Sequence, residues 1–251
     1  MSKLDWPDPP KVVQFAPPVV VEHEGIFVVR DDLLEGGTKR RIAHLVLNGK
    51  EDYAYASTVH GYAQLALAYA CRDNGKKLTL FVAKRPKSGR HPLTATAVSL
   101  GANVVEVWPQ PRLSYIQAEA RRYAEESPST RHLVPFGLAT REVLEALAEI
   151  ARQVPAENGL APPTEVWTAA GSGTLSRALQ LAWPDADFHA VAVEAKDPDV
   201  GRAELHFAEG SFSRPAKLLP PFPTVKNYDG YCWAWIKRLA RPGAWFWNCG
   251  G

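Results

Sequence analysis

The sequence has few cysteines, no long apolar run and almost no net charge. Its three cysteines, Cys71, Cys232 and Cys249, are widely spaced and form neither a disulfide framework nor a metal-binding pair. This usage favours a reducing, cytoplasmic setting, and no metal site is expected. No stretch reaches the roughly 18 apolar residues of a membrane-spanning helix. Residues 1–14 are polar and proline-rich, and they lack the apolar core of a secretory signal.

The charge balance narrows the function classes. Twenty-nine Lys and Arg against 27 Asp and Glu leave a formal charge of +2, whereas a domain devoted to a nucleic-acid backbone is normally clearly basic. Hydrophobic residues make up 46% of the chain, which excludes intrinsic disorder. The 251 residues suffice for one large or two small domains with a substantial core.

Short β-branched runs alternate with amphipathic or alanine-rich stretches along the chain. We expect strands at residues 26–30, 53–56, 78–83, 103–107, 131–134, 165–169, 189–193 and 244–247. We expect helices at residues 39–47, 61–73, 93–100, 114–126, 139–153, 175–183 and 231–239. Regular signals fade between residues 196 and 223. This alternation predicts an α/β fold with parallel sheets flanked by helices, which bind ligands beyond the carboxyl ends of their strands.

A paired-glycine turn follows the first strand. Residues 30–41 read Arg-Asp-Asp-Leu-Leu-Glu-Gly-Gly-Thr-Lys-Arg-Arg, so one residue separates the paired glycines from Lys39, at the start of a helix. Helix-end potential and partial burial both disfavour an ammonium, and this is how a lysine becomes a nucleophile able to form a Schiff base. A solvated lysine on a surface helix is the alternative.

A small polar loop follows the second strand. Its hydroxyls and backbone N–H groups are suited to an anion such as a carboxylate. The residues concerned are Ser57, Thr58, His60 and Gly61. Plain N-capping explains the loop equally well, and the histidine is either a ligand contact or an ordinary first-turn residue.

A glycine-rich loop joins a strand to a helix in the second half. It is suited to a phosphate group, and an acid, Glu194, ends the next strand about twenty residues later. That pair also fits a Rossmann nucleotide site, although Ser176 occupies the place of the third glycine. A structural tight turn is the third interpretation. The loop contains Gly171, Ser172, Gly173, Thr174 and Leu175.

The chain ends in an apolar strand that runs into Cys249-Gly250-Gly251. Tails are usually polar and disordered, so this strand indicates a docked terminus. Cys249 is either a site residue or a buried core residue.

Taken together and in this order, the four motifs resemble the fold-type II pyridoxal-phosphate enzymes. That family includes tryptophan synthase β, threonine dehydratase, 1-aminocyclopropane-1-carboxylate deaminase and D-cysteine desulfhydrase. The resemblance covers about residues 22–251 and includes the alanine-rich helix after Ala56 and the segments 97–107 and 133–150. It implies two lobes: a large cofactor-binding lobe of residues 1–50 and 139–251, and a small substrate-binding lobe of residues 51–138.

The resemblance also implies the cofactor and the residues around it. Pyridoxal 5'-phosphate would be held by Lys39 as a Schiff base, by the glycine loop Gly171, Ser172, Gly173, Thr174 and Leu175, and by Cys249 at the pyridine nitrogen. The substrate carboxylate would be held by Ser57, Thr58, His60 and Gly61. Lys39 would act as general base at Cα. Tyr231, ahead of Tyr228, would stack near the ring or relay a proton; both could instead pack with the neighbouring tryptophans.

The implied contact between Cys249 and the pyridine nitrogen favours some reaction types over others. A thiol is a weak donor to the pyridine nitrogen, and a poorly protonated ring is a mild electron sink. The expected enzyme is therefore lyase-like, with elimination, deamination or β-replacement on a small amino-acid-like substrate. The family suggests a homodimer.

Three other functions stay open. One is a Rossmann-type nucleotide or methyl-donor binding protein built around residues 171–194. The second is a non-catalytic descendant of the cofactor family, suggested by the short chain and by the altered loop at residues 57–60. The third is an enzyme acting on an amino-acid-modified DNA base, with the basic loop 84–91 contacting phosphates. Nucleic-acid binding is not favoured, since a solvated loop explains these charges.

Overall fold

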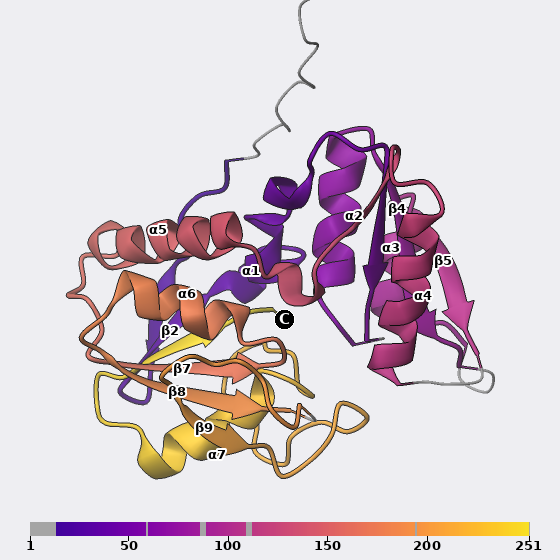
Figure 1. Ribbon diagram of the computed structural model, residues 1–251. Helices are drawn as coiled ribbons and strands as arrows, with labels where there is room; N and C mark the ends of the chain where they lie inside the picture. The colour runs from indigo at the N-terminus through magenta and orange to yellow at the C-terminus, as the bar shows by residue number, and fades with distance from the viewer. Residues whose placement is uncertain (1–13, 59, 86–88, 109–111, 194, 251) are drawn as a thin grey trace, which may run out of the picture. The chain divides into compact units, whose positions relative to one another are not determined.

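The protein divides into two compact units. The computed structural model describes residues 14–58, 60–85, 89–108, 112–193 and 195–250 (Figure 1). The smaller unit is Ala43–Phe136, and the larger unit is Phe15–Ile42 with the chain from Gly137 onward. The compact units divide after residues 42 and 136. The lobes expected from the sequence, with boundaries after residues 50 and 138, stay a prediction.

A six-stranded sheet forms the centre of the larger unit. Its order is β1, β2, β10, β7, β8, β9, and every neighbouring pair is parallel except the antiparallel pair β1–β2. The strands are β1 Val20–His23, β2 Ile26–Arg30, β7 Glu165–Ala170, β8 Asp187–Ala192, β9 Glu204–Phe207 and β10 Trp245–Asn248. Because β10 lies between β2 and β7, the end of the chain is a central strand of the sheet.

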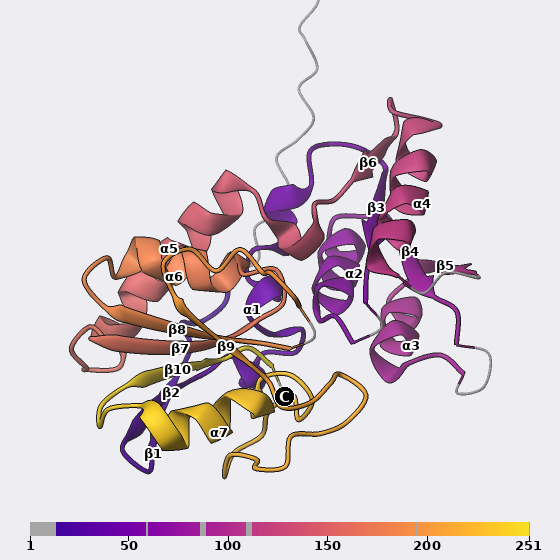
Figure 2. The same cartoon turned by 60° about the horizontal axis from the view of Figure 1, so that its bottom comes forward.

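Helices cover both faces of this sheet (Figure 2). The helices of this unit are α1 Gly37–Arg40, α5 Arg141–Glu157, α6 Thr174–Ala182 and α7 Gly230–Leu239. On one face, α5 and α6 bury Ala151 and Leu179 against Trp245 and Trp247. Neighbouring residues of a strand point to opposite faces, so Phe246, between Trp245 and Trp247, lies on the other face. There it packs in one hydrophobic cluster with Trp167 and residues of α7. The sheet is thus buried on both sides, as parallel sheets require.

The smaller unit has a parallel sheet in the order β5, β4, β3, β6. Its strands are β3 Asp52–Ala56, β4 Lys77–Ala83, β5 Asn103–Val107 and β6 Arg131–Leu133, and its helices are α2 Ala63–Asp73, α3 Pro92–Ser99 and α4 Leu113–Glu125. On one face of the sheet, Ile116 and Ala120 of α4 bury Ala54 and Phe81. A buried Asp52 accepts a 2.6 Å hydrogen bond from Tyr123 and ties α4 to β3.

The predicted α/β class, with parallel sheets flanked by helices, is confirmed, and most predicted elements lie within a few residues of their expected bounds. The predicted helix over residues 39–47 is wrong. The chain there forms only the short α1 and a separate 3-10 turn, Ala43–Val46. Arg41 explains the break, because its side chain turns back to donate to the Asp31 carboxylate and to the Ala16 carbonyl.

Two strands were missed. β1 is short and only partly buried, and β9 lies in the segment where the sequence gives no periodic signal. Both are outer strands of the sheet, with one paired side each. Within the described residues, no helix combines the length and the hydropathy that crossing a bilayer requires.

The core of the smaller unit offers a test of this packing. Leu80 of β4 is fully buried, whereas Val105 of the adjacent β5 is 38% exposed. We expect Leu80→Ala to lower the free energy of unfolding by about 2–5 kcal/mol, because it leaves a cavity. Val105→Ala, the matched control, should cost less than about 1 kcal/mol. Urea denaturation measures both, and equal losses would contradict the assigned core.

Candidate functional site

The carboxyl ends of three neighbouring strands of the larger unit lie together on one side of its sheet. Because β2, β10 and β7 are parallel, the segments that begin at Asp31, Cys249 and Gly171 all leave the sheet on the same side. α6 follows β7 on one face, whereas α7 precedes β10 on the other. Such a change of side is the place where open α/β sheets bind ligands.

The paired-glycine turn lies directly against the end of β10. Gly36 and Gly37 have φ values of 91° and 65°, a backbone conformation that suits glycine. A Cβ atom on Gly37 would collide with the carbonyl oxygen of Cys249. The Thr38 backbone N–H donates to that same oxygen at 3.0 Å. The turn therefore holds Lys39, two residues after Gly37, near Cys249.

A buried network of polar side chains holds this turn in place. Asp31 is fully buried and accepts a 2.7 Å bond from Arg41. The Trp247 indole N–H is shared between the Asp31 carboxylate at 3.1 Å and the Thr38 hydroxyl at 3.0 Å. Burial raises the pKa of Asp31, and Arg41, Thr38 and Trp247 oppose that rise. Removing one partner from such a network leaves an uncompensated buried group, which is strongly destabilising.

Lys39 has the electrostatics of a reactive amine. Burial lowers the pKa of its ammonium, while the nearby Cys249 acts in the opposite direction. A lowered pKa increases the fraction of neutral amine, the nucleophilic form.

The glycine loop has a fixed conformation at the start of α6. Gly173 has φ 77°, and a Cβ there would collide with the Asp199 carbonyl, so only glycine fits. The hydroxyls of Ser172 and Thr174 lie 2.9 Å apart. The start of the nine-residue α6 therefore presents backbone N–H groups and two hydroxyls at the sheet edge, a suitable arrangement for a phosphate group.

An unpartnered carboxylate lies beside the chain terminus. Asp229 is fully buried, and neither of its oxygens has a partner at hydrogen-bonding geometry among the described residues. Burial raises its pKa to about 7, although the Cys249 thiol and the backbone of residues 249 and 250 lie close enough to lower it. Burial and Asp229 raise the pKa of the Cys249 thiol well above its usual value, which keeps the thiol neutral.

The two candidate tyrosines have different surroundings. The hydroxyl of Tyr231 donates toward the carbonyls of Ser211 and Arg214 at 3.1 and 2.9 Å, and the ring belongs to the core under α7. Tyr231 is therefore held by structural contacts. Tyr228, the second choice from the sequence, has its hydroxyl 3.5 Å from the position that a Cβ on Gly171 would take. Burial and then Cys249 raise its pKa well above the usual value.

The proposed substrate residues form a compact loop in the smaller unit, between β3 and α2. The Ser57 hydroxyl donates to the Thr58 carbonyl at 2.7 Å, and the Gly61 N–H donates to the same carbonyl at 2.9 Å. The His60 ring meets the His91 ring edge-on, with centroids 4.6 Å apart. Burial lowers the pKa of His60, which favours a neutral imidazole. Their role in carboxylate binding stays a prediction.

Sequence reasoning overlooked Asp229. The polar run Asn227-Tyr228-Asp229-Gly230 before α7 reads as an ordinary helix start, and its burial depends on contacts with the distant residues 249 and 250. Two earlier candidates, Glu194 of the nucleotide hypothesis and Lys87 of the basic loop, lie outside the described residues.

Comparisons with known proteins give the fold a class. No family model matches the sequence, and no curated protein matches it. The solved structure of an "ACC deaminase homologue" aligns over 96% of this chain and 90% of its own, with TM-score 0.79 and 15% identity. Diaminopropionate ammonia lyase of Escherichia coli aligns over 96% and 84%, with TM-score 0.67 and 14% identity. O-acetylserine sulfhydrylase isoform 3 of Entamoeba histolytica aligns over 95% and 87%, with TM-score 0.66 and 11% identity.

These neighbours are fold-type II pyridoxal-phosphate enzymes, so the chain has the fold of that class. The resemblance inferred from the four motifs is thereby confirmed at the level of the fold.

The crowding at Gly37 predicts a large effect of one methyl group. Gly37→Ala adds both left-handed strain and a collision with the Cys249 carbonyl. Gly159→Ala is the matched control in the same unit, since Gly159 also has φ 65° but has open space around it. We expect Gly37→Ala to be less stable than the control by about 1–3 kcal/mol in urea denaturation. Similar losses would contradict the contact.

The raised pKa of Asp229 predicts a pH-dependent stability. The native carboxyl binds a proton up to about pH 7, whereas the unfolded one loses it near its ordinary pKa of 3.8. The native state therefore holds more protons in this window, and stability falls as the pH rises through it. In cofactor-free protein, Asp229→Asn should remove this fall, which amounts to at most about 4 kcal/mol by pH 8.

The control for this experiment is Asp185→Asn, at an exposed position of the same unit. Its stability curve should run parallel to that of the unmodified protein from pH 4 to pH 8. If the Asp229→Asn curve is also parallel, the carboxyl is not perturbed as described.

Proposed function

We propose that the protein is a pyridoxal 5'-phosphate-dependent enzyme that acts on an amino acid or an amino-acid-like group by elimination, deamination or β-replacement. The observation that carries the proposal is the cluster at the sheet edge, in which a lysine of lowered pKa adjoins Cys249 and follows a turn that only glycine fits. The names of the solved neighbours, a deaminase homologue, an ammonia lyase and a sulfhydrylase, support this reaction class.

The residues of the larger unit fit the cofactor in three places. The start of α6 offers N–H groups and the Ser172 and Thr174 hydroxyls to a phosphate. Lys39 offers an amine to an aldehyde. Asp229 offers a buried carboxylate whose oxygens have no partner at hydrogen-bonding geometry among the described residues, and a protonated ring nitrogen would satisfy it.

Asp229 changes the chemistry inferred from the sequence. The sequence assigned Cys249 to the pyridine nitrogen, but its thiol is held neutral and is a weak donor. A carboxylate at this place favours a protonated ring and thus a stronger electron sink. We therefore assign the ring nitrogen to Asp229, with Cys249 as its neighbour. This assignment supports deamination as well as elimination.

Each residue has a defined task. When bound, the cofactor supplies the aldehyde and the electron-withdrawing ring. Lys39 would hold the aldehyde and, once the substrate amine displaces it, would accept the proton from Cα. Tyr228, whose hydroxyl lies near Gly171 of the glycine loop, would hold a proton at that hydroxyl. Ser57, Thr58, His60 and Gly61 remain the proposed residues for the substrate carboxylate. A homodimer and a cytoplasmic location remain predictions of the resemblance.

The spectrum of the protein tests the proposal. Protein supplied with pyridoxal 5'-phosphate should be yellow and should lose its visible band on borohydride treatment. Lys39→Ala should abolish the band and all ammonia release from amino acids. Lys226→Ala, at an exposed position of the same unit, should keep both. No band in the unmodified protein, with stabilisation by a dinucleotide or S-adenosylmethionine instead, would favour the nucleotide-binding alternative.

A further inference from the structure

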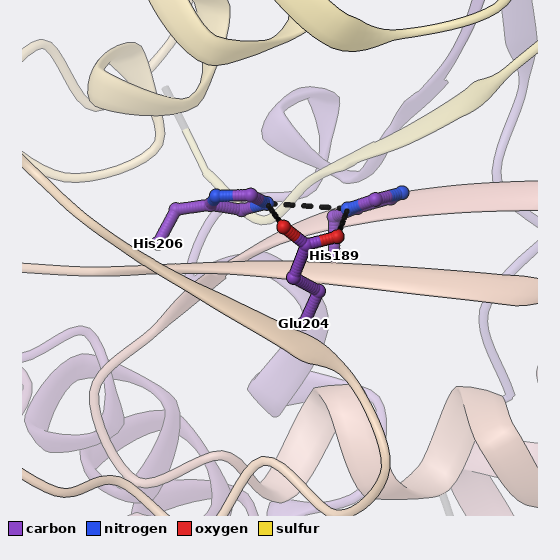
Figure 3. A group of neighbouring side chains, drawn as sticks. All are labelled: His189, Glu204 and His206. Carbon is purple, nitrogen blue, oxygen red and sulfur yellow. Dashed lines mark hydrogen bonds and ion pairs between the residues drawn. The ribbon is translucent and has the colours of Figure 1, made fainter.

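Two histidines and a glutamate gather at the outer edge of the larger sheet, apart from the strand ends that carry Lys39 and the glycine loop. They are His189 of β8 and Glu204 and His206 of β9 (Figure 3). Within the described residues, this is the group of three such side chains whose ligand atoms all lie within 4.8 Å of one another. The proposed function does not use any of the three.

Strand register brings these side chains to one face. His189 pairs with Glu204, and Val191 pairs with His206. Residues two apart on a strand point to the same side, so all three side chains project from the face covered by α7. The cluster is thus built by backbone pairing, because a one-residue slip of β9 would move both of its members to the other face.

Aromatic rings hold both imidazoles in place. The Trp167 ring stacks on His189 at 4.2 Å and on His206 at 5.3 Å, with interplanar angles of 11° and 15°. Trp235 of α7 covers His206, with centroids 4.6 Å apart. Trp167 is itself fixed by a 2.6 Å bond from its indole N–H to Glu165. The ring orientations are therefore set before any ligand arrives, which lowers the entropy cost of binding.

The distances match the coordination shell of one small cation. His189 Nδ1 lies 3.2 Å from His206 Nε2 and 3.5 Å from Glu204 Oε2, and His206 Nε2 lies 3.9 Å from Glu204 Oε1. Four ligands about 2.0–2.1 Å from a tetrahedral zinc ion are about 3.3–3.4 Å from one another. Glu204 is 65% exposed, so a cation can reach its carboxylate from solvent, and water is available as a fourth ligand.

We propose that His189, Glu204 and His206 form a binding site for a zinc-class divalent cation that links β8 to the outer strand β9. Two imidazoles and one carboxylate with an open fourth position are a ligand set that Zn²⁺ accepts. A cation there would add metal–ligand bonds to the backbone pairing, packing and side-chain polar contacts that already join the two strands. It would therefore stabilise the outer edge of the sheet by binding the native state.

Calorimetric titration of the full, untagged chain with Zn²⁺, after removal of metals by a chelator, tests the site. We expect saturable binding of one equivalent and, with Co²⁺, the absorption bands of tetrahedral coordination. Glu204→Gln and His206→Asn should each weaken Zn²⁺ binding about tenfold or more. The glutamine variant is at an exposed position, so its fold should be unaffected.

Two control variants remove the same residue types elsewhere. His91→Asn removes a histidine but keeps a side chain that caps α3. Glu209→Gln removes an exposed glutamate near the site. Both should bind Zn²⁺ as tightly as the unmodified protein. The Tm of the unmodified protein should rise when Zn²⁺ binds, and the Tm of both control variants should rise by the same amount. If the unmodified protein does not bind Zn²⁺, or if Glu204→Gln and His206→Asn bind it as tightly as the unmodified protein does, the three side chains form only a hydrogen-bonded cluster. Neither outcome depends on the cofactor.

Discussion

The close approach of the paired-glycine turn to the end of β10 organises the rest of the candidate site. The carbonyl of Cys249 occupies the space that a side chain on Gly37 would need, and it accepts the Thr38 N–H. Residues more than 200 positions apart in the sequence are thus joined backbone to backbone. This contact makes the segment that follows β10 part of the site, and it determines where Lys39 can lie.

Charge placement around this contact gives the site its chemistry. In the ion pair of Asp31 and Arg41, each buried charge offsets the desolvation cost of the other. The Trp247 indole N–H, which donates to Asp31, links this pair to the turn. In the described part of the chain, neither Lys39 nor Asp229 has an ion pair of this kind: burial lowers the pKa of the amine and raises that of the carboxyl. Groups kept away from their ordinary ionisation in this way are typical of functional sites, where a ligand supplies the missing partner.

Local patterns predicted much of this structure. The β-branched run at residues 26–30, the glycines before Lys39 and the Gly-Ser-Gly loop gave the α/β class and the main parts of the site. The sequence did not reveal Asp229, because burial of an acid beside a helix start depends on long-range packing. β9 was missed because it has only four residues and because its burial reverses the usual pattern: His206 is buried, whereas Phe207 is 53% exposed. The histidine cluster was missed with it, since its spacing of 15 and 17 residues has meaning only through strand register.

The central claim is that Lys39 is the amine that holds the cofactor. The most direct measurement is peptide mass spectrometry after the protein has been loaded with pyridoxal 5'-phosphate and reduced with borohydride. The account predicts a single stable cofactor adduct on the peptide that contains Lys39. An adduct on another lysine, or none on a fully folded protein, would contradict it.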